Sequence, residues 1–279
     1  SSHGLAMHRV AGTRFAAAVF TNLPQDHLDL HGTMEAYFAA KARLFDAAFT
    51  DLAVVCVDDP YGRLLVDAAT IRTVGYGLDD AEDLRLDVDG STLRWRGTEL
   101  RVPLAGRFNV RNALAAATVA DELGVPRDAI AAGIAATGAV RGRFEPVDEG
   151  QPFRVVVDYA HTPDAVEHAL RAARDLTSGK VVVVLGAGGD RDPAKRPRLG
   201  EVAARLADVA VITSDNPRSE DPQAIIDAVL EGVADRRGVL VEPDRAAAIA
   251  AAVAAAGPGD VVVLAGKGHE TTQTFADRV

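Results

Sequence analysis

The sequence predicts an α/β fold, and its second half predicts a doubly wound, mainly parallel sheet. Short apolar runs rich in valine alternate there with segments of helical length. Continuous runs of β-branched residues are typical of strands that are buried on both faces. Strands that alternate with helices pair in parallel, because each helix returns the chain to the same end of the sheet. The predicted strands are 154–158, 181–185, 209–213, 239–241 and 261–264, and the predicted helices are 165–176, 197–207, 224–234 and 245–256.

The first half of the chain predicts a less regular domain. Apolar runs at 15–20 and 53–57 predict strands on either side of a helix at 34–49. Three alternating segments follow, separated by the turn sequences DGS and RGT, and this pattern is typical of an antiparallel meander. Charge, glycine and proline then concentrate at 142–152, so we expect two domains, 1–145 and 146–279. The meander segments are 84–88, 92–95 and 99–102, and two further helices are predicted at 110–123 and 127–136.

Composition restricts the class of protein. The chain has 279 residues, 48% of them apolar, which suffices for one large or two ordinary domains. A net charge of −10 and a pI near 5.2 argue against a nucleic-acid partner, which requires a basic face. Cys56 is the single cysteine, so we expect no disulfide within the chain and a cytoplasmic location. No apolar run is long enough to predict a membrane span.

The segment 21–41, TNLPQDHLDLHGTMEAYFAAK, is the most informative part of the first half. His27 stands between Asp26 and Asp29, and Lys41 follows in an alanine-rich helical run. An apolar run that predicts a strand precedes this polar cluster, and α/β proteins build sites where strands end. The ordinary alternative is that the acidic residues cap a helix and that Lys41 is simply solvated.

Polar loops follow four of the five predicted strands of the second half. They read DYAHTPD at 158–164, GAGGDRD at 186–192, SDNPRS at 214–219 and AGKGHE at 265–270. Loops at the carboxyl ends of parallel strands converge on one crevice, so we expect their charged residues to share a site. Arginines there would bind carboxylates and acids would bind ammonium groups, unless they only pair with each other. The candidates are Asp158, His161, Arg191, Asp215, Arg218 and Glu270.

Two nucleotide-binding motifs do not fit this chain. GAGGDRD follows an apolar run, but a G-x-G-x-x-G fingerprint would need glycine at the position of Arg191. This mismatch argues against a nicotinamide-dependent oxidoreductase. The sequence also contains no G-x-x-x-x-G-K-[ST] phosphate loop. If the protein uses ATP, the loop that holds the triphosphate lies outside this chain.

Several motifs together resemble the Mur ligase family along essentially the whole chain. They are SSHGLAMHRV, the 21–41 segment, GRFNVRNALAA, GRFE, DYAHTPDA, GAGGDRDPAKRP, DNPR and GKGHE, in this order. The resemblance implies part of a P-loop-type central ATPase domain followed by a Rossmann-like, doubly wound C-terminal domain. It also implies that the chain is an N-terminally truncated fragment, without the uridine-nucleotide domain and the phosphate loop.

The resemblance implies an ATP-dependent carboxylate–amine ligase. Such enzymes phosphorylate a carboxylate with ATP, and an amine then attacks the acyl phosphate, which yields an amide, ADP and phosphate. Lys41 matches the family's carbamylated lysine, and His27 matches its metal-binding histidine. A carbamate supplies oxygen ligands that suit Mg²⁺, and Mn²⁺ can also serve because imidazole is an unusual Mg²⁺ ligand.

Further site residues are implied by the same resemblance. Ser1 and Arg9 match positions that hold the UDP-sugar-peptide, and Asn112 matches a position near the adenine. Arg143, Asp158 and His161 match positions around the nucleotide, with Arg143 at the phosphates and therefore also a catalytic candidate. Bland alternatives are that Asn112 braces its helix and that Arg143 pairs across the domain boundary.

The DNPR motif accompanies meso-diaminopimelate in the family, whereas lysine-adding members usually lack this arginine. Arg218 would bind the carboxylate that lysine lacks, with Arg191 and Asn216 assisting. Asp215, Glu270 and the carbonyl of Gly266 would accept from ammonium. The implied partners are UDP-MurNAc-L-Ala-D-Glu and meso-diaminopimelate, and a monomer is expected. The alternatives are a ligase that adds L-lysine, a folylpolyglutamate-type ligase and, for this fragment, an inactive ligand-binding module.

Overall fold

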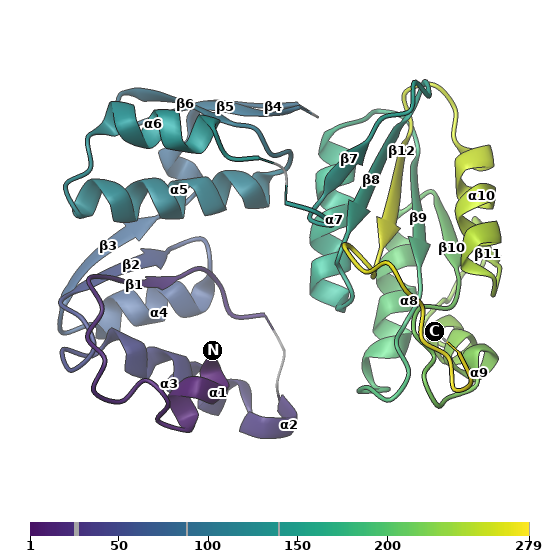
Figure 1. Ribbon diagram of the computed structural model, residues 1–279, viewed down its shortest axis with the longest axis horizontal. Helices are drawn as coiled ribbons and strands as arrows, with labels where there is room; N and C mark the ends of the chain where they lie inside the picture. The colour runs from purple at the N-terminus through teal and green to yellow at the C-terminus, as the bar shows by residue number, and fades with distance from the viewer. Residues whose placement is uncertain (25–27, 88, 139, 279) are drawn as a thin grey trace. The chain divides into compact units, whose positions relative to one another are not determined.

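The computed structural model describes residues 1–24, 28–87, 89–138 and 140–278 (Figure 1). Contacts divide the chain into two compact units. The first unit comprises Ser1–Arg85, Asp89–Pro103 and Arg107–Thr137, and the second comprises Leu86–Val88, Leu104–Gly106 and Gly138–Val279. A domain boundary between residues 145 and 146 stays a prediction.

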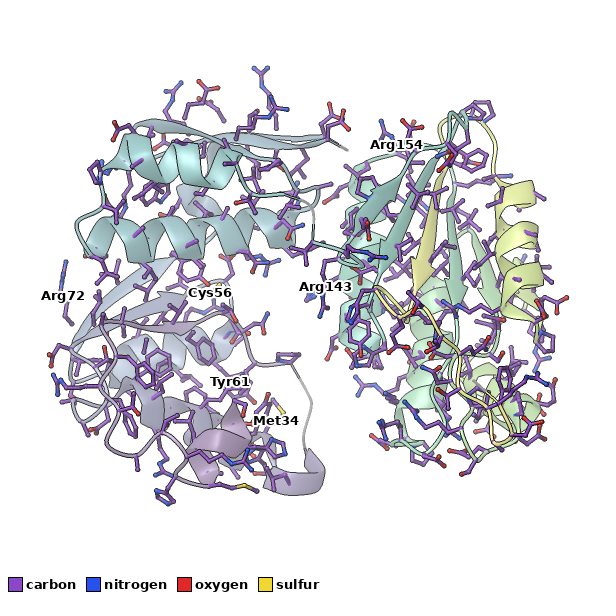
Figure 2. All side chains as sticks on the ribbon, in the orientation of Figure 1. Met34, Cys56, Tyr61, Arg72, Arg143 and Arg154 are labelled. Carbon is purple, nitrogen blue, oxygen red and sulfur yellow. The ribbon has the colours of Figure 1, made fainter. Side chains whose placement is uncertain are left out.

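A three-stranded parallel sheet forms the centre of the first unit, in the order β1 (Ala18–Phe20), β2 (Leu52–Cys56) and β3 (Arg72–Tyr76). All five residues of β2 are buried, as expected for a central strand without polar alternation. The core beside it includes Phe20 and Phe45, and Met34 and Tyr61 pack against this core (Figure 2). The flanking helices are α1 (Ser2–Ala6), α2 (Leu28–His31), α3 (Met34–Ala42) and α4 (Pro60–Ala68).

Three expectations for this sheet need correction. The helix predicted at 34–49 ends at Ala42 and continues only as the 3₁₀ turn η1 (Arg43–Phe45). Asp46 is extended and its Oδ1 accepts from the N–H of Ala48 at 2.8 Å, a local turn that competes with the helix. The strand predicted at 15–20 covers only Ala18–Phe20, and α4 and β3 were not predicted.

The predicted meander is confirmed as the sheet β4 (Glu82–Asp87), β5 (Gly90–Trp95) and β6 (Thr98–Val102). Strands β5 and β6 pair antiparallel through a two-residue turn at Arg96 and Gly97, whose φ angles are +47° and +80°. Two positive φ angles match the twist of a tight hairpin. Trp95 is 1% exposed, and the guanidinium carbons of Arg96 and Arg127 lie 5.1 and 5.8 Å from the Trp95 ring centroid. Helices α5 (Arg107–Glu122) and α6 (Arg127–Ala135) complete the unit.

Two helical glycines of the first unit give opposite predictions. A Cβ on Gly133 in α6 would meet nothing within 4 Å, whereas a Cβ on Gly62 in α4 would lie 1.9 Å from the carbonyl oxygen of Cys56. We expect Gly133→Ala to raise the free energy of unfolding by about 0.5–1 kcal/mol, because alanine lowers the conformational entropy of the unfolded chain. We expect Gly62→Ala to destabilise by about 2 kcal/mol, because the backbone must move. Denaturant unfolding followed by fluorescence of Trp95, the only tryptophan, measures both, and a lower midpoint for Gly133→Ala would contradict the first.

The second unit contains a six-stranded sheet in the order β11-β10-β9-β12-β8-β7. Five strands are parallel and confirm the predicted runs, whereas β7 (Glu145–Val147) pairs antiparallel with β8 at the edge. The sequence analysis did not predict β7, because it lies where glycine and proline indicated a linker. The parallel strands are β8 (Arg154–Asp158), β9 (Val181–Leu185), β10 (Val209–Ile212), β11 (Val239–Val241) and β12 (Val261–Ala265).

Helices cover both faces of this sheet. Ala248 and Ala252 of α10 pack onto valines of β9, β10 and β12, while α7 lies on the opposite face beside α8 (Figure 1). Strand β12 lies between β8 and β9 and is parallel to both. The loops that follow these three strands therefore all begin at the carboxyl end of the sheet. The helices are α7 (Pro163–Asp175), α8 (Lys195–Leu206), α9 (Pro222–Leu230) and α10 (Arg245–Ala255).

Across the described ranges, no helix combines the length and the apolar character that crossing a membrane requires.

Candidate functional site

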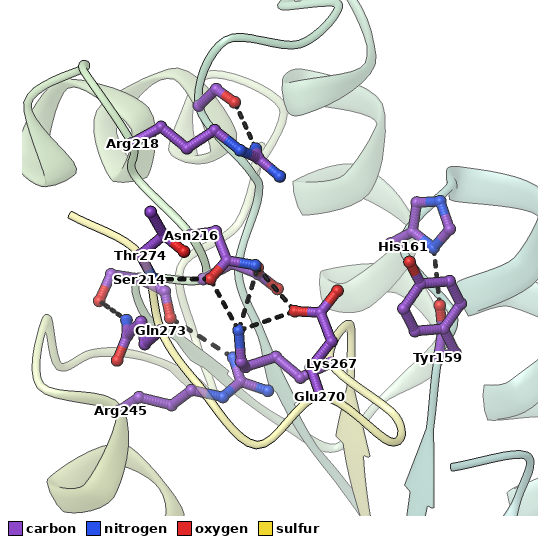
Figure 3. A network of polar contacts seen from close by, with 12 residues as sticks. Tyr159, His161, Ser214, Asn216, Arg218, Arg245, Lys267, Glu270, Gln273 and Thr274 are labelled. Carbon is purple, nitrogen blue, oxygen red and sulfur yellow. Dashed lines mark hydrogen bonds and ion pairs between the residues drawn. The ribbon is translucent and has the colours of Figure 1, made fainter. Parts of the chain in front are cut away.

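The loops after β10 and β12 meet in a set of buried and half-buried polar side chains, which we call the Asn216 cluster: Asp215, Asn216, Lys267 and Glu270 (Figure 3). Asn216 Oδ1 accepts from Lys267 Nζ at 2.9 Å and from the N–H of Thr274 at 2.9 Å. Asn216 Nδ2 donates to Glu270 Oε2 at 2.8 Å. The structure therefore brings together three of the predicted residues, Asp215, Asn216 and Glu270.

Lys267 was not among the predicted site residues. Its Nζ donates to Glu270 Oε2 at 3.0 Å and lies 3.9 Å from Asp215 Oδ1, and its side chain is 12% exposed. The sequence does carry a signal, a lysine between two glycines in a polar loop that also contains Glu270.

Arg245 is a second charged residue that was not among the predicted site residues. Its Nη2 donates to the carbonyl of Ala265 at 2.8 Å and its Nη1 to the carbonyl of Ser214 at 3.4 Å. Burial lowers the pKa of Arg245, and the charges of Asp215 and Glu270 raise it, so the guanidinium stands near both acids. Arg245 joins the strand ends of β10 and β12 beneath the cluster.

The charge state of Glu270 follows from its neighbours. Burial raises its pKa, but hydrogen bonds from Asn216 and Lys267 and the charges of Lys267 and Arg218 outweigh burial. The net result is a pKa below the usual range for glutamate. Glu270 is therefore an anion at neutral pH and can accept from an ammonium group.

Arg218 lies in the DNPR loop in a left-handed conformation, with φ of +54°. Its main-chain N–H donates to the carbonyl of Thr274 at 3.0 Å, and its Nη1 donates to the carbonyl of Gly189 at 2.6 Å. Within the described part of the chain, neither Arg218 nor Arg191 forms an ion pair with a carboxylate. The side chain of Arg191 is exposed, and its Nη1 donates only locally, to the carbonyl of Asp190 at 2.9 Å.

The loop after β9 and the DNPR loop are fastened to each other. Ser219 donates its hydroxyl to Asp190 Oδ1 at 2.6 Å, and the N–H of Asp190 donates to Glu220 Oε1 at 2.6 Å. The same Glu220 oxygen accepts from Nη2 of the buried Arg196 at 2.8 Å. These contacts of Asp190 and Glu220 hold the loop that carries Arg218. The guanidinium itself is held by the backbone carbonyl of Gly189.

A separate group surrounds Tyr159, and we call it the Tyr159 cluster: Arg143, Tyr159, His161 and His269. The guanidinium carbon of Arg143 lies 4.9 Å from the Tyr159 ring centroid. The rings of His161 and His269 lie 4.7 and 5.4 Å from the same ring. His161 Nδ1 contacts the carbonyl of Tyr159 at 2.7 Å, beside the Asn216 cluster in Figure 3. Among the described residues, no hydrogen bond or ion pair joins the side chains of the two clusters.

Asp158 holds the Tyr159 cluster in place. Its Oδ2 accepts from the N–H of Phe144 at 2.7 Å and its Oδ1 from the N–H of Ala160 at 2.7 Å. Burial raises its pKa above the usual range, although both hydrogen bonds and the charges of Arg143 and His161 act in the opposite direction. Asp158 thus ties the segment that carries Arg143 to the end of β8.

This arrangement gives a prediction for pH dependence. Because the folded pKa of Asp158 is raised, its effect on stability is most favourable below the unfolded pKa and declines as pH rises through the folded pKa. We expect Arg143→Met to raise that pKa further and to extend the decline to higher pH. Carboxyl ¹³C NMR titration and denaturation at several pH values measure both effects. The exposed Arg141→Met is the matched control, and an unchanged Asp158 titration in Arg143→Met would refute the prediction.

The predicted residues of the first unit lie on several elements. Ser1 caps α1, where its Oγ accepts from the N–H of Gly4 at 3.2 Å. Arg9 is exposed and its Nη2 contacts Met7 Sδ at 3.3 Å. Asn112 is exposed on α5. His27 lies outside the described residues.

Lys41 lies at the end of α3, with Nζ 5.2 Å from the ring centroid of Tyr37. The ring of His31 stacks on Tyr37 at 5.0 Å, and the buried Nε2 of His31 has no hydrogen-bond partner among the described residues. Among described residues, no group of three or more His, Cys, Asp or Glu side chains is arranged to hold a metal ion. This imidazole nitrogen fits a polar group or ion next to His31, because a buried polar atom without a partner is costly.

Comparison with known proteins covers both units. Residues 1–120 match the Mur ligase middle domain, and residues 142–268 match the Mur ligase glutamate ligase domain. A UDP-N-acetylmuramoyl-L-alanyl-D-glutamate–2,6-diaminopimelate ligase from Streptomyces coelicolor is 50% identical, over 99% of this chain and 58% of the relative. The chain therefore spans less than two thirds of that relative's length.

Solved structures agree with the sequence comparison. A diaminopimelate ligase of the same name superposes with a TM-score of 0.64 at 36% identity, over 99% of this chain and 60% of the other. A Mycobacterium tuberculosis folylpolyglutamate synthase complexed with ADP and AMPPCP shares the fold, with a TM-score of 0.70 at 23% identity over 90% and 61% of the two chains. Since two Mur ligase domains account for most of its residues and its similarity to the diaminopimelate ligases extends over nearly its whole length, this chain belongs to the Mur ligase family.

Proposed function

We propose that the protein that contains this chain is an ATP-dependent ligase that adds meso-diaminopimelate to UDP-MurNAc-L-Ala-D-Glu in peptidoglycan synthesis. The observation that carries the proposal is the Asn216 cluster with Arg218 beside it. Two carboxylates are available for ammonium groups, and a guanidinium without an ion pair among the described residues is available for a carboxylate. A diamino diacid supplies both kinds of group. The name of the Streptomyces coelicolor relative agrees with this substrate.

The proposed reaction proceeds in two steps. Transfer of the γ-phosphoryl group of ATP to the glutamate carboxylate gives an acyl phosphate and ADP. An amine of diaminopimelate then attacks the carbonyl carbon, phosphate leaves, and an amide forms. The Asn216 cluster and Arg218 would orient the amino acid so that this amine reaches the acyl phosphate, which is a contribution of proximity.

The Tyr159 cluster is the proposed site of the nucleotide. Arg143 would contact the phosphates, Asp158 would hold Arg143 in place, and His161 would lie beside the nucleoside. Asn112 would contact the adenine, while Ser1 and Arg9 would hold the UDP-sugar-peptide. The ADP and AMPPCP complexes of the folylpolyglutamate synthase agree with ATP as the nucleotide of this fold.

Lys41, in carbamylated form, and His27 are the proposed ligands of Mg²⁺, with Mn²⁺ as a substitute. A cation at this place would offset the negative charge that builds up on the transferred phosphoryl group. The unpartnered Nε2 of His31 supports a polar occupant here. Lys41 must leave the face of Tyr37 when it is carbamylated, because the ring face attracts cations and repels anions.

The oligomeric state, location and domain organisation of the whole protein are proposed together with its activity. We propose a monomer in the cytoplasm, since the single Cys56 is free and buried and the proposed substrates are soluble nucleotides and amino acids. We propose domains at 1–145 and 146–279. The second candidate activity is that of a ligase that adds L-lysine. L-lysine lacks the second carboxylate, so Arg218 would not bind the amino acid in that case.

Calorimetric titration of this chain with meso-diaminopimelate and, separately, with L-lysine tests the proposed substrate. Binding of diaminopimelate alone is the expected result. Preference for L-lysine would overturn the proposed substrate and favour the second candidate. Phosphate release from ATP in the presence of Mg²⁺ and both substrates distinguishes a ligase from a binding module, because a module alone gives no release above background.

A further inference from the structure

We propose that Lys267 is a positioning residue for the amino-acid substrate. In this role it orients the amide of Asn216 and the carboxylate of Glu270 so that their remaining hydrogen-bonding groups receive the substrate. It also cancels one of the two negative charges at the site. This inference rests on the proposed function, because it assigns a further residue to the same amino-acid site.

The hydrogen bonds of Lys267 determine which way Asn216 faces. The Oδ1 atom accepts from two donors, Lys267 Nζ and the N–H of Thr274, so the oxygen must lie on that side. The amide nitrogen is thereby turned to Glu270, where it donates to Oε2. A second hydrogen on Nδ2 is left for a ligand. Without Lys267, Oδ1 would keep only the Thr274 N–H as a donor, and the bond from Nδ2 would depend on a Glu270 carboxylate that Lys267 no longer holds.

Glu270 is oriented by the same ammonium group. Its Oε2 accepts from both Lys267 and Asn216, at 3.0 and 2.8 Å. Within the described residues, Oε1 has no hydrogen bond from the protein. Oε1 and the carboxylate of Asp215 are therefore the acceptors that remain for a substrate ammonium.

The charges of the site depend on Lys267 as well. Asp215 and Glu270 contribute two negative charges, and Asp215 is 7% exposed, so their repulsion is poorly screened. Arg218 and Arg245 lie nearby, but their hydrogen bonds go to backbone carbonyls. Lys267 bonds directly to Glu270, so it offsets the charge of this carboxylate more closely than either arginine does.

The loop backbone fixes where the Lys267 side chain can go. Gly266 and Gly268 on either side have φ angles of +107° and +48°. A Cβ on Gly266 would lie 2.7 Å from Asp215 Oδ2, and a Cβ on Gly268 would lie 2.7 Å from the Cβ of Tyr159. The chain thus passes between the two clusters at a place that admits only glycine on either side of the lysine, and the lysine is directed into the Asn216 cluster.

The test compares Lys267→Met, which keeps the length and removes the charge, with Lys267→Arg, which keeps the charge. Lys180→Met is the matched control, since Lys180 is exposed and precedes β9 at the opposite end of the strand. Calorimetry measures the affinity for meso-diaminopimelate, and carboxyl ¹³C NMR measures the pKa of Glu270. Far-UV circular dichroism confirms that each variant is folded.

We expect Lys267→Met to weaken diaminopimelate binding roughly tenfold or more, as for loss of a charged hydrogen-bond donor. We expect the pKa of Glu270 to rise, because Lys267 lowers it through both its hydrogen bond and its charge. Lys267→Arg should recover most of the affinity, and Lys180→Met should change neither quantity.

Unchanged affinity and an unchanged Glu270 pKa in Lys267→Met would overturn the inference. Equal weakening in Lys267→Met and Lys267→Arg without a change in that pKa would also overturn it, since packing alone would then explain the loss. The Glu270 titration needs no ligand. If the unsubstituted chain binds neither amino acid, the proposed substrate fails, and the titration still decides whether Lys267 controls Glu270.

Discussion

Arg218→Ala is expected to lower the affinity for meso-diaminopimelate roughly 100-fold, or about 3 kcal/mol, while leaving the affinity for ATP unchanged. The guanidinium uses Nη1 for a single hydrogen bond to the carbonyl of Gly189. Its other nitrogens can bind a carboxylate bidentately, which is the strongest form of this contact. Removing Arg218 leaves the second carboxylate of the ligand without a partner. Calorimetry with each ligand measures the two affinities separately.

The matched control is Arg236→Ala, because Arg236 is an exposed arginine after α9. We expect it to change neither affinity. The same experiment distinguishes the substrates, because L-lysine has no second carboxylate and should bind with similar weakness to both proteins. Equal losses of diaminopimelate and ATP affinity in Arg218→Ala would contradict its assignment as the residue that selects the amino acid.

Gly189→Ala is expected to destabilise the second unit by roughly 3 kcal/mol, at the upper end of the range for overpacking. A Cβ on Gly189 would lie 1.9 Å from the carbonyl oxygen of Pro217 and 3.3 Å from Ile225 Cδ1. The first neighbour is backbone, so the DNPR loop must move. The N–H of Gly189 also donates to the carbonyl of Asn216 at 2.9 Å, and a shift of the loop weakens that bond. Amide hydrogen exchange of β9 measures the stability of this unit.

The neighbouring Gly188→Ala provides the control. A Cβ there would lie 3.1 Å from Arg218 Nη1, the far end of a flexible side chain, and its other neighbours would lie at 3.9 Å, an ordinary van der Waals distance. We expect Gly188→Ala to leave stability nearly unchanged and to weaken diaminopimelate binding through Arg218. If the two alanine variants were equally stable, close packing of the loop after β9 against the DNPR loop would be refuted.

Much of the second unit was predictable from local pattern. The runs 154–158, 181–185 and 239–241 are strands with the predicted bounds, because buried parallel strands consist of continuous apolar residues. Asp221 and Asp244 cap α9 and α10, and such caps depend on neighbouring residues alone. In the first unit, the helix predicted at 34–49 ends at Ala42, so its predicted end was wrong. Alanine-rich composition does not reveal the turn that Asp46 makes.

The candidate site was predictable only in its residue types and loops. The sequence placed polar residues after four strands, and the structure confirms that two of these loops supply Asp215, Asn216 and Glu270 to one cluster. The structure places His161 apart from these residues, next to Tyr159 and Arg143. The loops after β10 and β12 meet although β9 lies between these strands. The loop after β8 lies beside the loop after β12 because β8 and β12 are neighbours, and the second loop also supplies His269 to the Tyr159 cluster.

The sequence by itself determined the α/β class, the parallel strands of the second unit, the resemblance to the Mur ligases and the acidic and basic character of the loops. These properties depend on residue type and on spacing along the chain. Only the tertiary structure decided the contacts of Lys267, the place of Arg245, the edge strand β7 and the division into two clusters. Asn216 and Glu270 are 54 residues apart in sequence, and they meet because β12 inserts between β8 and β9. Contacts between side chains so distant in sequence are set by the packing of the whole sheet, which no local pattern records.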